Sequence, residues 1–199
     1  MEILAQHYQD VCDRITRAAQ ACGRDPASIR LLAVSKTFGV DAIRTVAGCG
    51  QTDFGENYIQ EGVDKIAAVA NALPDTPLEW HFIGPIQSNK TRPIAANFSW
   101  VHTVERLKIA QRLSEQRPPE LGPLNICLQV NISGEASKSG VTPEELPALA
   151  QAVAALPNLR LRGLMAIPPE ESDHEAQDRK SHTSELQSHL NLVCRLLLE

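Results

Sequence analysis

The stretch Ile29-Arg-Leu-Leu-Ala-Val-Ser-Lys36 decides the fold, because it is an apolar run that ends in an amine. It contains no turn residue before Ser35, and it lies between Pro26 and Gly39. These features predict a buried strand of a mostly parallel sheet. In open α/β sheets and in α/β barrels, the functional groups gather at the carboxyl ends of the strands. Lys36 is therefore the first candidate site residue.

Two interpretations of Lys36 are open from this residue alone. A partly desolvated ammonium loses hydration, which favours the neutral amine and makes the side chain a nucleophile that can form a Schiff base. A strand-end lysine that reaches into water is the more common arrangement, since most lysines are solvated. The choice between them depends on the other motifs of the chain.

The composition fits one soluble globular domain. The chain has 199 residues, 43% of them hydrophobic, and a formal net charge of -5; this length is sufficient for a real core. The acidity argues against a nucleic-acid partner, and no apolar run approaches the ~20 residues that span a membrane. The first residues lack a secretory signal, and five scattered cysteines indicate reduced thiols rather than disulfides or a zinc site. We therefore expect a cytoplasmic protein without nucleic-acid or membrane partners.

Helical and strand patterns alternate along the chain. Apolar spacing predicts helices over 3–22, 40–48, 59–72, 87–96, 105–115 and 142–155. Apolar runs predict strands over 29–35, 53–57, 78–84, 99–104, 124–132 and 159–167. A kink or break is expected at Pro93, and the last helix is expected to open with a Thr142–Glu145 capping box and Pro143 at its first position. Six strands separated by five helices predict parallel βαβ units.

Two architectures are open for these units, a doubly wound sheet and a (β/α)8 barrel. No Gly-x-Gly-x-x-Gly follows the first strand, which disfavours a dinucleotide-binding sheet. The leading helix and the repeated units favour the barrel. Because a full barrel takes about 250 residues, we predict an incomplete α/β barrel of the (β/α)8 TIM-barrel type, with about six of eight βα units present.

The carboxyl-terminal residues differ in character from the rest. Residues 178–189 are polar and residues 190–199 are apolar, and a genuine terminal amphipathic helix is one interpretation. The other is that Asn191 to Glu199 can be encoded by DNA that resembles the far end of a common short-read sequencing adapter. We favour the second interpretation, which predicts a truncated barrel over residues 1–177 and a non-native tail over residues 178–199.

Several predicted strands end in segments of unusual residues, most of which contain polar side chains. Besides Ser35-Lys36, the segments are Phe54-Gly-Glu-Asn-Tyr58, His81-Phe-Ile-Gly84, Asn131-Ile-Ser-Gly134 and Gly163-Leu-Met-Ala166. In a parallel barrel the carboxyl ends of all the strands converge on one mouth. Taken singly, each segment has an ordinary structural explanation: Glu56 can cap a helix, His81 can be a satisfied core histidine, and Asn131 can be a turn residue.

Taken together, five strings in order resemble the pyridoxal 5′-phosphate homeostasis proteins, the YggS/PROSC family. The strings are LLAVSKT, FGENYIQE, WHFIGPIQSNK, VNISGEASKSG and GLMAIP, and the resemblance covers Ile3 to about Glu175. It implies the barrel of the amino-terminal domain of alanine racemase, with pyridoxal 5′-phosphate (PLP) as cofactor. By this resemblance Lys36 holds PLP as a Schiff base. The resemblance further implies that the cavity is lined by Asn57, His81, Asn131 and Met165.

The resemblance implies a non-catalytic, monomeric protein that buffers or delivers PLP in the cell, with PLP-dependent apoenzymes as recipients. The alternatives are a PLP-dependent racemase or decarboxylase of the same barrel type and a plain scaffold with a phosphometabolite site. Racemases of that group add a β-domain with a catalytic tyrosine, for which this chain is too short, and its Tyr8 and Tyr58 are poor candidates. The family also continues with two βα units that hold the phosphate, and this chain lacks their motifs, so we expect weak PLP retention.

Overall fold

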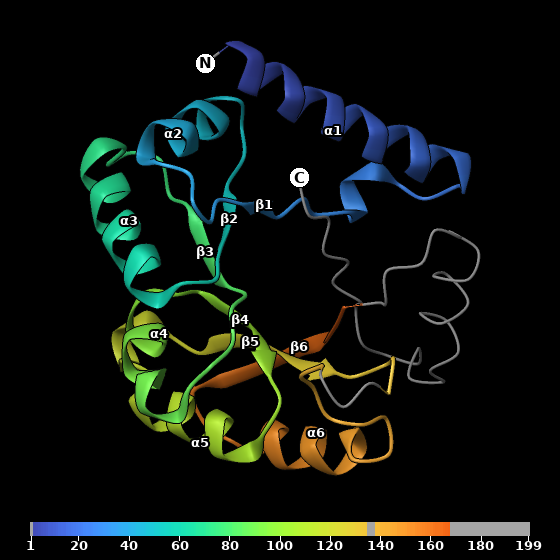
Figure 1. Ribbon diagram of the computed structural model, residues 1–199, viewed down its shortest axis with the longest axis vertical. Coiled ribbons are helices and arrows are strands. Elements are labelled where there is room, and N and C mark those ends of the chain that lie inside the picture. Colours follow the sequence, from blue (N-terminus) through green and yellow to red (C-terminus); the bar gives the residue numbers. More distant parts are fainter. Residues whose placement is uncertain (1, 135–137, 168–199) are drawn as a thin grey trace. The chain divides into compact units, whose positions relative to one another are not determined.

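A computed structural model of the chain describes residues 2–134 and 138–167. Strands and helices alternate through them (Figure 1). The strands are β1 (Ala33–Val34), β2 (Asp53–Glu56), β3 (Glu79–Phe82), β4 (Trp100–Val104), β5 (Leu124–Val130) and β6 (Leu159–Ala166). The helices are α1 (Glu2–Ala21), α2 (Val40–Gly48), α3 (Ile59–Ala72), α4 (Thr91–Asn97), α5 (Leu107–Gln116) and α6 (Leu146–Ala154). Short 3₁₀ turns are η1 (Pro26–Ser28), η2 (Ser88–Lys90) and η3 (Pro119–Leu121).

The strands form one sheet in chain order, β1-β2-β3-β4-β5-β6. The pairs β1–β2, β3–β4, β4–β5 and β5–β6 are parallel, and a helix connects each strand to the next. In β5 every residue except Asn125 is buried, as expected for a parallel strand that is covered on both faces. The predicted parallel βαβ organisation is therefore confirmed.

The chain divides into two compact units, of which the first extends to Trp80 and the second begins at His81. In the first unit the buried rings of Phe54 and Trp80 lie 5.8 Å apart. In the second unit Phe82 and Phe98 meet edge to face at 5.3 Å. Each such large apolar side chain contributes about 1.5–3 kcal/mol when it is fully buried. Each unit thus has its own apolar core.

The four cysteines within the described residues are free thiols. Cys22 and Cys49 are exposed and Cys12 is half-buried, and all three belong to the first unit. Cys127 lies in β5 of the second unit, where burial raises the pKa of its thiol to about 12. Within residues 2–134 and 138–167, no helix has both the length and the apolar character needed to cross a membrane.

Three predicted boundaries were wrong. The strand predicted over 29–35 is paired only at Ala33–Val34. The Gln51 side chain donates to the carbonyl of Leu31 at 2.8 Å, so this carbonyl accepts from a side chain and not from the backbone of a neighbouring strand. The expected break at Pro93 lies instead at the junction of η2 and α4. Pro93 is in the first turn of α4, where a backbone N–H has no helical partner to lose.

The third correction concerns the start of α6, which begins at Leu146 and not at Pro143. The capping box itself is present. The N–H of Glu145 donates to Thr142 Oγ1 at 3.3 Å, and the N–H of Thr142 donates to Glu145 Oε2 at 3.3 Å. These reciprocal bonds hold residues 143–145 as a turn ahead of the regular helix. The boundary predicted at residue 177 and the tail over 178–199 lie outside the described residues.

Candidate functional site

Lys36 lies in a tight turn directly after β1. Its side chain is half-buried, and the turn is closed by a hydrogen bond from the N–H of Phe38 to the carbonyl of Ser35, at 3.1 Å. The next residue, Thr37, has a φ of 68°. This left-handed conformation is uncommon for a β-branched residue, so the surroundings have to hold it. The amine is thus carried on a backbone of defined and strained shape.

Asn57 occupies the equivalent position after β2. Val34 of β1 pairs with Gly55 of β2, so Lys36 and Asn57 each come two residues after a paired position. Asn57 is half-buried, and its Oδ1 is buried without a hydrogen-bond partner among the described residues. A buried acceptor without a donor costs about 1–3 kcal/mol, and a bound molecule that donates a hydrogen bond would remove that cost.

A buried ionic network lies next to the Lys36 turn, and the sequence analysis missed it. The ammonium of Lys65 on α3 donates to the carbonyl of Ser35 at 2.7 Å, to Glu56 Oε1 at 2.9 Å and to Glu61 Oε1 at 2.6 Å. Glu56 also accepts from Ser35 Oγ at 2.6 Å, and Glu61 accepts from the N–H of Thr37 at 2.8 Å. The sequence signal for it was the i, i+4 spacing of a glutamate and a lysine on a predicted helix, which usually marks a solvated pair.

The charges of the network are unevenly exposed. Glu56 is fully buried, and its second carboxylate oxygen has no hydrogen-bond partner among the described residues. Glu61 is partly exposed, and its pKa is lowered by the hydrogen bond from Lys65, with a smaller contribution from the N–H of Thr37, against the opposing effect of burial. One ammonium therefore serves two carboxylates.

The first unit also contains a cavity of about 550 Å³ between α1, α2 and β1. Its lining is mainly apolar and includes Phe54. Ser35 and Phe38 line it too, whereas Lys36, which lies between them in the chain, does not. The amine is therefore not directed into this cavity.

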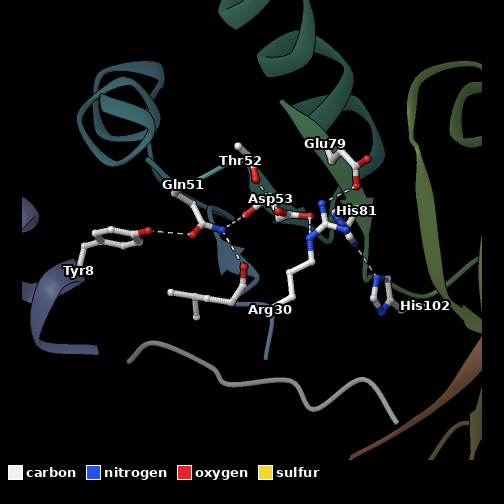
Figure 2. A network of polar contacts seen from close by, with 9 residues as sticks. Tyr8, Arg30, Gln51, Thr52, Asp53, Glu79, His81 and His102 are labelled. Carbon is white, nitrogen blue, oxygen red and sulfur yellow. Dashed lines mark hydrogen bonds and ion pairs between the residues drawn. The ribbon is translucent and has the colours of Figure 1, made fainter. Parts of the chain in front are cut away.

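Figure 2 shows the polar groups that fix the strands on which the candidate residues lie. In the first unit the guanidinium of Arg30 bonds Asp53 at 2.8 Å and Glu79 at 3.0 Å. Gln51 bonds the carbonyl groups of Leu31 and Asp53 at 2.8 and 2.7 Å and accepts from Tyr8 at 3.2 Å. These contacts hold the amino ends of β1 and β2, opposite to the ends that carry Lys36 and Asn57.

His81 is buried in β3 of the second unit. Its Nδ1 lies 2.9 Å from Nε2 of His102 on β4, as Figure 2 shows, and its ring stacks on Trp100 at 5.4 Å. Because one proton lies between the two facing nitrogens, at least one of them carries no hydrogen. The pair can relay or share a proton, but it also has the satisfied geometry of a core histidine.

Asn131 follows β5 in the second unit and organises its own loop. Its Nδ2 donates to the carbonyl of Lys138 at 3.1 Å, and its Oδ1 accepts from Ser133 Oγ at 3.0 Å. Met165, which is 2% exposed, pairs with Gln129 across β5 and β6. The structure thus brings together Lys36 and Asn57 in one unit, and Asn131 and Met165 near the carboxyl ends of two paired strands in the other. A cavity shared by all five residues stays a prediction.

Comparison with known proteins defines the class of this fold. The family model for the alanine racemase N-terminal domain matches residues 9–197, so the chain belongs to that family and has its TIM-barrel type of fold. The crystal structure of alanine racemase from Corynebacterium glutamicum agrees, with a TM-score of 0.63 at 15% identity over 91% of this chain and 48% of that one. At this identity the likeness concerns the fold alone.

Within this class, the chain belongs with the pyridoxal phosphate homeostasis proteins. It is 64% identical over 177 residues to the pyridoxal phosphate homeostasis protein of Pseudomonas aeruginosa, which covers 89% of this chain and 75% of the relative. PipY of Synechococcus elongatus, solved with PLP bound, matches with a TM-score of 0.68 and 33% identity over 87% of this chain and 81% of that one. The family expected from the sequence is confirmed.

Proposed function

We propose that this protein binds PLP at Lys36 and takes part in intracellular PLP homeostasis as a carrier without catalytic activity of its own. The observation that carries the proposal is the position of Lys36, a half-buried lysine in a fixed turn at the carboxyl end of β1. Parallel α/β folds place their ligand-binding groups at this edge. The name of the Pseudomonas aeruginosa relative and the PLP bound to PipY support the same ligand.

The residues of the first unit fit such a ligand chemically. PLP supplies an aldehyde, whose carbon forms a C=N bond with the Lys36 amine while its oxygen leaves as water. The amine has to be neutral to react. Asn57 Oδ1 is an unused buried acceptor at the matching position of the adjacent strand, and it would accept a hydrogen bond from the ligand. Lys36 thus supplies the bond and Asn57 the orientation.

Three residues of the second unit also belong to the set that the family resemblance assigns to PLP. His81 would contribute its imidazole ring, which the 2.9 Å contact of its Nδ1 with His102 Nε2 holds in place. Asn131 would contribute from the loop that it organises after β5, and Met165 would form an apolar wall. These three roles follow from the family resemblance.

The carrier role also implies partners and a compartment. We expect PLP-dependent apoenzymes to receive the cofactor, and the protein to act as a monomer in the cytoplasm. The four free thiols within the described residues suit a reducing compartment. The net charge of -5 disfavours a nucleic-acid partner. The related proteins are named for homeostasis and not for a reaction, which supports a carrier over a racemase or decarboxylase.

Reductive trapping tests the binding role. The chain is incubated with PLP, treated with borohydride, digested and analysed by mass spectrometry, and we expect one reduced cofactor on Lys36. Lys36→Arg keeps the charge but cannot form the bond, so its trapped fraction should be lost, whereas the exposed Lys108→Arg on α5 serves as the matched control and should trap normally. Label spread evenly over the lysines, or full trapping in Lys36→Arg, would overturn the assignment.

A turnover assay separates the carrier from an enzyme. The PLP-loaded protein is incubated with a panel of L- and D-amino acids, and chiral chromatography and detection of released CO₂ follow racemisation and decarboxylation. We expect no turnover above that of free PLP at equal concentration. Multiple turnovers that disappear in Lys36→Arg would replace the carrier role by an enzymatic one.

A further inference from the structure

Lys65 is an unusual lysine because its ammonium is buried. The residue is 8% exposed, and all three N–H donors of its ammonium are used, by the carbonyl of Ser35 and by the carboxylates of Glu56 and Glu61. Lysines are seldom buried unless they are paired. With its donors taken, Lys65 cannot act as a nucleophile toward a ligand, so its function has to be sought in the groups that it holds.

Those groups contact the residues directly before and directly after Lys36 in the chain. On one side, Ser35 is bonded through its carbonyl to Lys65 and through its hydroxyl to Glu56. On the other side, the N–H of Thr37 donates to Glu61, which Lys65 holds at 2.6 Å. Lys65 therefore joins both ends of the Lys36 residue through a few short contacts.

The turn needs this support because of Thr37. A left-handed β-branched residue is unfavourable, and the φ of 68° persists only if neighbouring contacts outweigh the strain. The hydrogen bond from the Thr37 N–H to a carboxylate is of the strong, charge-assisted kind. If it were lost, Thr37 could return to ordinary backbone angles, and Lys36 would then be displaced.

We infer that Lys65, acting through Ser35, Glu56 and Glu61, is a positioning residue that holds the Lys36 turn in the shape required for capture of PLP. The inference rests on the proposed function. The apparent affinity for PLP is proportional to the fraction of molecules that hold the competent turn. Loss of the Thr37 contact alone should therefore raise the dissociation constant of PLP about tenfold. The reason is that the free energy of a charged hydrogen bond corresponds to roughly this change in the ratio of competent to other conformers of the turn.

The test compares two variants of the network with their controls. Lys65→Met removes the ammonium, and Glu61→Ala removes the acceptor of the Thr37 N–H at a partly exposed position that should tolerate the change. Glu61→Gln is the conservative variant, because it keeps an amide oxygen for the same N–H. Gln51→Met is the matched control: like Lys65 it makes three hydrogen bonds in the same unit, but at the amino ends of β1 and β2 (Figure 2).

The readouts are the dissociation constant of PLP, the rate at which label appears on Lys36 after PLP addition and borohydride quenching, and the melting temperature. We expect Lys65→Met and Glu61→Ala to bind PLP about tenfold more weakly and to label more slowly, with Glu61→Gln close to the unsubstituted chain. Gln51→Met should melt at a lower temperature but bind PLP with an unchanged constant.

The outcomes separate the inference from the proposed function. If the unsubstituted chain is not labelled at Lys36, the proposed function fails. If the unsubstituted chain is labelled, and Glu61→Ala binds PLP and is labelled equally well, the positioning role is wrong and the proposed function stands. If Gln51→Met weakens binding as much as Glu61→Ala, the effect is general loss of stability and the inference is again overturned. Glu61→Ala decides the question should Lys65→Met not fold.

Discussion

At Gly140 the structure allows a quantitative prediction of how much the addition of one methyl group lowers stability. It has a φ of 126°, a region that only glycine occupies readily. An added Cβ would lie 2.6 Å from the backbone N of Asn131, 2.7 Å from the carbonyl carbon of Val130 and 3.1 Å from the carbonyl oxygen of Gln129. All three are backbone atoms of β5 or its end, so no flexible side chain can move aside.

The cost of Gly140→Ala can be built from these contacts. The backbone strain amounts to about 1–3 kcal/mol. Relief of the clash would pull the loop away from β5, where the N–H of Gly140 donates to Glu105 and Val141 exchanges two 2.9 Å bonds with Gln129 and Asn131. Loss of the charged bond adds about 1.5–3 kcal/mol. We therefore expect the free energy of unfolding to fall by about 3–5 kcal/mol and the melting temperature by about 10 °C.

Urea unfolding followed by circular dichroism measures this change, and Gly134→Ala is the control. Gly134 also has a positive φ, 69°, but nothing lies within 4 Å of its would-be Cβ. It should lose only the strain of a left-handed residue, about 1–2 kcal/mol. If the two variants unfold at the same urea concentration, the close approach of Gly140 to β5 does not contribute and the reasoning is refuted.

Three further predictions concern the Lys36 turn and the chain end. Thr37→Gly should leave the free energy of unfolding unchanged within about 1 kcal/mol or raise it, because relief of the left-handed strain offsets the added chain entropy; a loss of several kcal/mol in urea unfolding would contradict this. Because the folded pKa of Glu61 is lowered from 4.5, its stabilising contribution is complete above that pH and is lost as the pH falls through the folded value. Unfolding of Glu61→Gln from pH 6 to pH 3 should thus show a deficit that shrinks below pH 4.5, and a constant deficit would argue against the ion pair. Removal of residues 178–199 should leave the melting temperature within a few degrees, and an unbroken genomic reading frame through them would end the idea of a non-native tail.

The fold could be predicted from periodicity where helices and strands are bounded by clear signals. The pattern over 59–72 gave α3 with the observed ends, because apolar spacing and flanking polar residues agree there. β1 could not be predicted as well: Leu31 is apolar, but its carbonyl accepts a hydrogen bond from the Gln51 side chain. Strand length depends on such a tertiary partner, which no local pattern records.

The candidate site was predictable only in part. Lys36 stands out because a cation ends an apolar run, and Asn57 follows a strand in the same way. Lys65 carries no such mark, since a lysine on a predicted helix is usually solvated, and Glu56 has the ordinary explanation of a helix cap. Only the packing of α3 against the end of β1 turns them into a buried network.

The thiol of Cys127 gives this chain a built-in reporter. Because its pKa is about 12 and its side chain is buried in β5, it should react very slowly with a maleimide dye at neutral pH. The exposed Cys22 and Cys49 of the first unit should react rapidly. The substitution Cys194→Ser removes the one other cysteine that follows Cys127 in the sequence. In that chain, the slow rate of alkylation of Cys127 would measure how often the second unit opens. Added PLP would lower this alkylation rate if the cofactor stabilises the second unit, and would leave the rate unchanged if only the first unit responds.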